Sequence, residues 1–129
     1  MPETANLEEI PVMYVSAPNP KESAGAFNEL ESKLDVFKGR RFYGVVFDNE
    51  YRACVTLRSA DEAEMLGLKS FTIPGGRYAK AKITDWSQHL DEICKVFDEL
   101  AEEFTRDESR PVIEFYRSQK ELILFLPIK

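Results

Sequence analysis

The sequence predicts an α+β domain in which one strand–helix–strand–strand module occurs twice. The order strand, helix, strand, strand can be traced over residues 10–58 and again over 77–128, an offset of about seventy residues. Each copy contains one stretch of apolar residues at helical spacing and ends in two strand-like segments around a short polar turn. The turn at Asp48-Asn49 aligns with Ser118-Gln119, and Gly44 aligns with Glu114.

The first copy begins with a predicted strand at 7–17 and continues into a helix. Asn19 and Pro20 are typical of a helix start, because asparagine caps free backbone N–H groups and proline fits the first turn. Glu22 stands where a capping box requires it, and Gly39 is predicted to end the helix. Apolar residues recur between them at helical spacing, namely Phe27, Leu30, Leu34 and Phe37.

A linker at residues 60–76 joins the two copies. It is predicted to hold a short helical turn that ends at Gly67, followed by a short strand. The second copy opens with a strand at 77–84, and Asp85 is predicted to cap its helix. The apolar face of that helix is Leu90, Ile93, Phe97, Leu100 and Phe104.

Each copy closes with a hairpin, formed by strands 41–47 and 50–58 in the first and by 112–117 and 121–128 in the second. Neither hairpin alternates apolar and polar residues, as a sheet with one face in water does. Both faces of the sheet are therefore predicted to be covered. Two helices cover only one side of each half, so the other side must pack on the second half, a partner or a ligand.

Glu114 is the one acidic residue in the predicted strand 112–117. If Ile113 and Phe115 face the helix, Glu114 and Tyr116 lie on the second covered face. A carboxylate there is costly unless it is paired or hydrogen-bonded. Two interpretations remain open.

In the first interpretation, Glu114 is partly exposed near the mouth of a cleft and pairs with an arginine such as Arg41 or Arg52. In the second, it is a functional carboxylate in an aromatic cavity. There it would hold a cationic or planar ligand or, with a raised pKa, act as a general base.

Composition excludes several classes of function. The 129 residues suit one domain, 1–129, and the net charge of −6 disfavours nucleic acids and anionic membranes as partners. No signal peptide or membrane span is visible, so a cytoplasmic protein is expected. Cys54 and Cys94 lack neighbouring ligands at metal spacing and are interpreted as buried thiols in a reducing cytosol. The sequence leaves both a monomer and a homodimer open.

Several segments resemble the GyrI-like family, which includes effector-binding domains of AraC- and MerR-type regulators, gyrase-inhibitor-like proteins and stand-alone relatives. The segments are Gly67-Leu68, IPGGRYA (73–79), RPVIEFYR (110–117), LILFLPIK (122–129) and, in the first half, RRFYGVVFDN (40–49) with EYRACVTL (50–57). The resemblance runs from about residue 7 to residue 129.

The resemblance implies a duplicated β-α-β-β fold with pseudo-twofold symmetry. Half-repeats at about 7–59 and 77–129 would form an antiparallel sheet with two long helices on one face and a ligand cleft between the halves. The family's pocket glutamate corresponds to Glu114. The aromatic lining would comprise Phe42, Tyr43, Tyr51, Tyr78, Trp86 and Tyr116.

The sequence also departs from the family. Arg52 stands where an Asp is usual, which makes cationic ligands less expected. Proteins of the related SOUL type bind haem, but the only histidine, His89, falls in a predicted helix and is expected in solvent. No cofactor or metal is therefore predicted.

Three functions follow from the resemblance. The first is capture of a hydrophobic, aromatic or cationic small molecule around Glu114. The second is hydrolysis of reactive cyclopropane-containing xenobiotics, with Glu114 activating water and Tyr78 assisting at the carbonyl. The third is a protein interaction such as gyrase inhibition. No helix-turn-helix precedes the domain, so direct DNA regulation is not expected.

Overall fold

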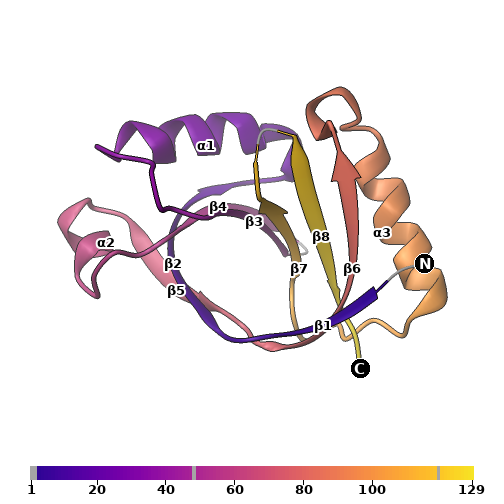
Figure 1. Ribbon diagram of the computed structural model, residues 1–129. Helices are drawn as coiled ribbons and strands as arrows, with labels where there is room; N and C mark the ends of the chain where they lie inside the picture. Colours follow the sequence, from indigo (N-terminus) through magenta and orange to yellow (C-terminus); the bar gives the residue numbers. More distant parts are fainter. Residues whose placement is uncertain (1–2, 48, 119) are drawn as a thin grey trace.

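A computed structural model describes residues 3–47, 49–118 and 120–129. It contains one eight-stranded antiparallel sheet in the order β1-β6-β8-β7-β3-β4-β2-β5. Helices α1 (Ser23–Ser32) and α3 (Glu92–Glu103) lie on the outer face of this curled sheet (Figure 1). The strands are β1 (Glu3–Leu7), β2 (Ile10–Ala17), β3 (Phe42–Phe47), β4 (Glu50–Thr56), β5 (Lys69–Ile73), β6 (Gly76–Thr84), β7 (Val112–Tyr116) and β8 (Glu121–Pro127).

The predicted α+β class with two copies of one module is confirmed. The order β2-α1-β3-β4 recurs as β6-α3-β7-β8, with the short helix α2 (Glu62–Met65) in the connection. Strands β3 and β7 meet in the middle of the sheet, where Gly44 is the direct partner of Glu114. These two positions are equivalent in the repeat, so the pseudo-twofold axis passes between them.

Short connections force the sheet to curl. β1 pairs with β6 near one edge, whereas β2 pairs with β4 and β5 near the other. Only two residues separate β1 from β2, and only two separate β5 from β6, so the two edges must approach each other. Gly75 permits this approach, because a Cβ there would lie 2.8 Å from the carbonyl oxygen of Leu7.

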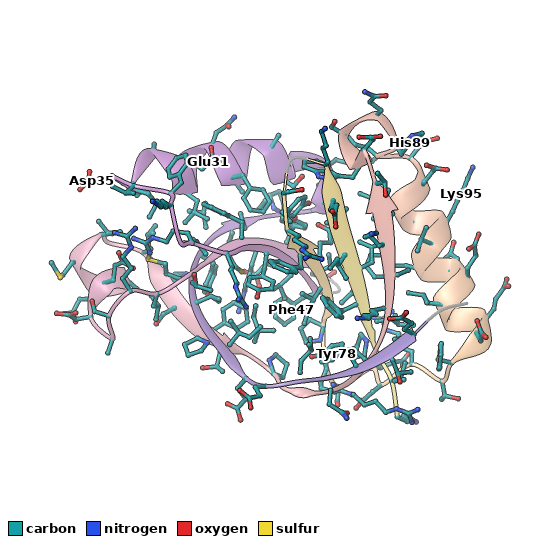
Figure 2. The ribbon with its side chains drawn as sticks, viewed as in Figure 1. Glu31, Asp35, Phe47, Tyr78, His89 and Lys95 are labelled. Atoms are coloured by element: carbon teal, nitrogen blue, oxygen red, sulfur yellow. The ribbon has the colours of Figure 1, made fainter. Side chains whose placement is uncertain are left out.

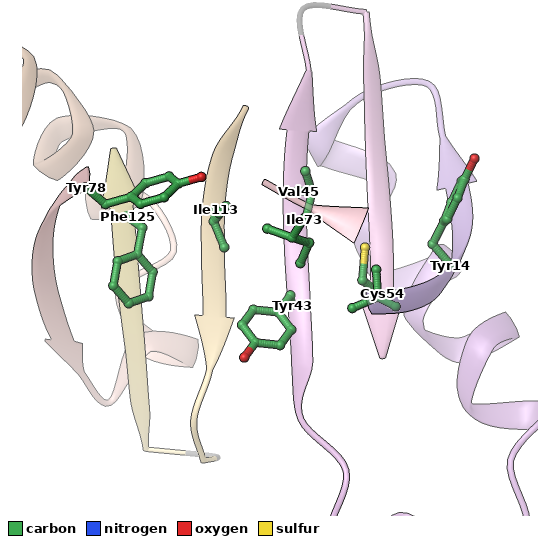
Figure 3. Close-up of a cluster of buried hydrophobic side chains, with 9 residues drawn as sticks. Tyr14, Tyr43, Val45, Cys54, Ile73, Tyr78, Ile113 and Phe125 are labelled. Atoms are coloured by element: carbon green, nitrogen blue, oxygen red, sulfur yellow. The ribbon is translucent and has the colours of Figure 1, made fainter. Parts of the chain in front are cut away.

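The inner face of the curl is filled by the chain's own side chains. Figure 2 shows Phe47 and Tyr78 pointing into this enclosed space, while Glu31, His89 and Lys95 lie outside on the helical side. Figure 3 shows the packed cluster, which comprises Val12, Tyr14, Tyr43, Val45, Cys54, Ile73, Tyr78, Ile113 and Phe125. Since this space is occupied by protein, a binding cleft has to be sought on the outer face.

The outer face carries the two helices. α1 packs over β2 and β4, and α3 packs over β6 and β8. Leu30 of α1 packs with Met13, Ala53 and Val55 of the sheet, and on the other half the buried residues are Leu100 of α3 and Ala79, Leu124 and Leu126 of the sheet. The helices therefore cover the two halves and leave the central strands β3 and β7 between them. In the described residues, no helix is long and apolar enough to cross a membrane.

Both predicted helix boundaries need correction. α1 ends at Ser32, and Gly39, with φ of 80°, instead shapes the turn into β3. Asp85 adopts a left-handed conformation with φ of 53° and makes no side-chain cap. Its N–H donates to the carbonyl of Lys120, which ties it to the end of the sheet, and α3 begins only at Glu92.

The predicted facing of the central strands is also wrong. Ile113 and Phe115 belong to the inner cluster, whereas Glu114 lies on the outer, helical face. The prediction that both faces are covered is correct. The predicted hairpin at β3 and β4 is confirmed by the pairing of Phe47 with Glu50, while Asp48 and Gln119 of the predicted turns lie outside the described residues.

Candidate functional site

Glu114 is the central feature of the outer face. It stands in the middle of β7, and within residues 3–47, 49–118 and 120–129 it is the only polar or charged residue of the buried core. Only 6% of its surface is exposed. A carboxyl group in such surroundings needs hydrogen-bond donors.

Two tyrosine hydroxyls supply these donors. Tyr51, on β4, and Tyr116, on β7, each lie 2.8 Å from Oε1 of Glu114 and donate to it. The two hydroxyl oxygens are 3.2 Å apart, so the three side chains form one cluster. We call Tyr51, Glu114 and Tyr116 the carboxyl cluster.

Gly44 makes room for this cluster. A Cβ at Gly44 would lie 2.5 Å from Oε1 of Glu114 and closer still to the hydroxyl group of Tyr51. The absence of a side chain on β3 therefore lets Tyr51 reach across the strand to the carboxyl group. A glycine inside a strand pattern was the one sign in the sequence of this close approach.

An aromatic cleft of about 500 Å³ lies above the cluster, between α1 and the turn that precedes α3. Phe27 of α1 contacts both tyrosines edge to face, with ring centroids 6.2 Å from Tyr51 and 5.2 Å from Tyr116. On the opposite wall, Trp86 meets Tyr116 at 5.1 Å. Phe42, Leu90 and Arg40 complete the wall, and Asn28, Glu31, Arg117 and Ser118 lie among the polar residues of the lining.

Burial governs the ionisation of the cluster. Desolvation raises the pKa of Glu114 above its ordinary value, and the hydrogen bonds from Tyr51 and Tyr116 oppose that rise. Burial likewise raises the pKa of both tyrosines, so they remain hydroxyl donors at neutral pH. Among the described residues, no lysine, arginine or histidine forms a salt bridge with Glu114.

Five of the seven predicted site residues gather here. Glu114, Tyr51 and Tyr116 form the carboxyl cluster, while Phe42 and Trp86 line the cleft. The other two do not reach it, because the alternation of side chains along a strand turns them to the inner face. Tyr43 stacks on Phe115 at 4.9 Å, and Tyr78 donates from its hydroxyl to the carbonyl of Pro74.

The first interpretation of Glu114, pairing with an arginine, is not borne out in the described residues. Arg52 lies on the inner face, where its guanidinium group sits 4.4–4.6 Å from the ring centroids of Tyr14, Phe47 and Phe71. Its Nε donates to Glu50. Arg52 therefore brings no positive charge to the cleft.

Sequence reasoning missed the roles of Phe27 and Leu90, both of which were assigned to the apolar faces of helices. Phe27 does belong to such a face, but it covers the carboxyl cluster as well as the sheet. Leu90 precedes α3 and is 57% exposed at the cleft. Helical spacing identifies apolar residues without showing whether they border a core or a cleft.

A second groove, of about 740 Å³, runs along α3 and β6. Its lining mixes charged residues with apolar ones such as Val96 and Ile123. Its lysines pair with carboxylates: Lys80 with Glu3 and Lys82 with Glu121. It contains no buried ionisable side chain and is therefore the weaker candidate. In the part of the chain that the structure describes, no group of three His, Cys, Asp or Glu residues is arranged to hold a metal ion.

Comparison with solved structures shows the same fold across the chain. An integron cassette protein from the mobile metagenome of Vibrio cholerae has a TM-score of 0.78 at 13% identity, covering 99% of this chain and 95% of that one. SAV2435, solved with tetraphenylphosphonium bound, has a TM-score of 0.61 at 13% identity, with 100% and 94% covered. A hydrolase from Listeria innocua has a TM-score of 0.63 at 13% identity, with 99% and 91% covered.

At these identities the likeness shows the fold alone. No model of a protein family matches the chain, and the comparison with curated proteins found no match. The solved structures are consistent with the GyrI-like fold that the sequence resembles, and they include a protein that binds a small molecule.

Proposed function

We propose that this chain binds a hydrophobic small molecule that carries a positive charge, in the cleft above Glu114. The observation that carries the proposal is a buried carboxyl group, beneath an aromatic cleft, that no described cation neutralises. Aromatic faces attract cations, and a carboxylate in a poorly solvated site attracts them further. SAV2435, which shares the fold, holds tetraphenylphosphonium, a cation of this kind.

The cleft has a size that suits such a ligand. Pockets for small molecules usually measure about 300–1,000 Å³ and combine apolar walls with a few polar groups. Here the aromatic walls are Phe27, Phe42, Trp86 and Tyr116, and the hydroxyl group of Tyr116 links the lining to the carboxyl group of Glu114.

A thermal-shift screen of hydrophobic amines, onium salts including tetraphenylphosphonium, and neutral aromatic compounds tests the proposal. Cationic ligands should bind, and Glu114→Gln should weaken them by about tenfold or more, since the site loses its charge. Glu99→Gln is the matched control, because Glu99 lies in the second groove, and it should leave affinity unchanged. Ligands indifferent to Glu114→Gln would contradict the proposal.

A second candidate is hydrolysis, which the raised pKa of Glu114 favours. A carboxyl group with a raised pKa suits general acid–base catalysis near neutral pH. In opening an electrophilic cyclopropane, Glu114 would take a proton from water while the water oxygen bonds to a ring carbon and the ring C–C bond breaks. The freed electron pair would pass to an adjacent carbonyl, which a tyrosine hydroxyl stabilises.

The tyrosine in this role would be Tyr51 or Tyr116 rather than Tyr78, which lies on the inner face. Incubation with a cyclopropane-containing alkylating compound should give a product that has gained one water, detected by mass spectrometry. Glu114→Ala should abolish that product, and Tyr78→Phe should retain it. If the wild-type protein gives no such product, hydrolysis of this compound class is ruled out as its function.

A further inference from the structure

We propose that the cleft selects protonated amines, whose positive nitrogen carries an N–H, over quaternary cations of the same shape. This inference rests on the proposed function of the cleft and names the class of ligand. It comes from the unequal surroundings of the two oxygens of Glu114.

One oxygen is saturated and the other is free. Oε1 accepts from both Tyr51 and Tyr116 at 2.8 Å. Oε2 accepts no hydrogen bond from any residue that the structure describes. In residues 3–47, 49–118 and 120–129, the side-chain polar atoms that are both sealed from solvent and without a hydrogen-bond partner are Arg40 Nε and Arg110 Nη1. Oε2 of Glu114 is not one of them. Oε2 therefore retains exposed surface and an unused acceptor site.

The nearby cations of the cleft are engaged elsewhere. Arg40 is tied to both carboxylate oxygens of Glu62 and to the carbonyl of Thr56. Arg117 is exposed and lies 3.7 Å from the carboxylate of Glu121. Neither neutralises Glu114. A ligand would therefore supply both the positive charge and the hydrogen-bond donor for Oε2.

An ammonium N–H supplies both at once. A hydrogen bond between an ionised donor and a carboxylate is about twice as strong as a neutral one. A quaternary nitrogen supplies the charge without the donor, and it would displace water from Oε2 and leave that acceptor unpaired, which is costly in a buried site. We therefore expect an amine to bind about tenfold more tightly, or better, than its quaternary counterpart.

Two probes that differ by one methyl group test this selectivity. They are N,N-dimethyl-(4-phenylbenzyl)amine, protonated at neutral pH with one N–H, and its N,N,N-trimethyl salt. Affinities are measured by titration calorimetry on the wild type and on Glu114→Met, which removes the acceptor at nearly constant volume. The dimethyl compound should bind about tenfold more tightly to the wild type, and the ratio should fall towards one in Glu114→Met.

Any steric effect of the extra methyl group would persist in Glu114→Met, so the change in ratio isolates the hydrogen bond. Circular dichroism confirms that the variant is folded. If it is not, Glu114→Gln provides a second measurement, because an amide oxygen that accepts from Tyr51 and Tyr116 leaves an NH2 donor in place of Oε2, so the ratio should again fall towards one. Equal affinities in the wild type, or tighter binding of the quaternary salt, would overturn the inference and leave the proposed function standing. Binding of neither probe up to millimolar concentration would contradict both.

Discussion

Gly44→Ala is the sharpest test of how the site is built. A Cβ at this position would lie 2.5 Å from Oε1 of Glu114 and closer still to the Tyr51 hydroxyl. Tyr51 is 1% exposed and Glu114 is 6% exposed, so the added methyl group would have to displace closely packed side chains. Overpacking of a buried site costs about 1–3 kcal/mol, and loss of one hydrogen bond adds about 1 kcal/mol. We expect a loss of about 2–4 kcal/mol in the free energy of unfolding.

Urea unfolding followed by circular dichroism measures this loss. With a slope of about 2 kcal/mol per molar urea, the midpoint should fall by about 1–2 M. Gly25→Ala is the matched control, because a Cβ there meets nothing within 4 Å. Alanine should stabilise that helical position by about 0.5–1 kcal/mol. If Gly44→Ala unfolds at or above the wild-type midpoint, the tight packing at Gly44 is refuted.

A double variant identifies the clash itself. Tyr51→Phe removes the hydroxyl group that a Cβ at position 44 would meet. Alone it should destabilise the protein by about 1–2 kcal/mol, because Glu114 loses a donor. Combined with Gly44→Ala it should cost less than the sum of the two single changes. Strict additivity would show that the hydroxyl group and position 44 do not interact.

Four further predictions concern charge. Burial raises the pKa of Glu114 above 4.5, so the folded protein binds the proton more tightly than the unfolded chain does. The contribution of this residue to stability therefore falls as pH rises from about 4.5 through the raised pKa. In urea unfolding over that rise in pH, Glu114→Gln should gain stability relative to the wild type. Glu62→Ala should lower the free energy of unfolding by about 3–5 kcal/mol in the same assay, because the guanidinium group of Arg40, whose side chain is 4% exposed, loses its carboxylate partner. Glu3→Ala, in an exposed pair, should change stability by less than about 0.5 kcal/mol. Arg52→Met should lower stability by about 1–2 kcal/mol through lost cation–π contacts, yet calorimetry should find the affinity of cleft ligands unchanged within about twofold, because Arg52 lies on the inner face.

Local patterns in the sequence were sufficient for most elements. The hairpins, the repeat and the existence of both long helices follow from alternation, turn residues and helical spacing. The helix limits were wrong where a glycine or a capping residue serves a turn instead, as Gly39 and Asp85 do. β1 was not anticipated, since its role as an edge strand depends on the distant partner β6.

The candidate site was predictable in part. Glu114 was identifiable as a carboxylate on a covered strand, and Tyr116 shares its face by the period of two. Tyr51 joins them only through the pairing of three strands across the sheet. Tyr43 and Tyr78 show the limit of a list of aromatic residues, because both are buried on the other side of the sheet.

The sequence by itself determined the duplicated module, the two covered faces of the sheet and the presence of one acidic residue in an apolar strand. Only the tertiary structure decided which face is which. Alternation along a strand separates two sets of side chains but gives neither set a direction. That direction comes from the two-residue connections between β1 and β2 and between β5 and β6, which curl the sheet, fill its inside with Ile113 and Phe115, and turn Glu114 outward beneath the helices.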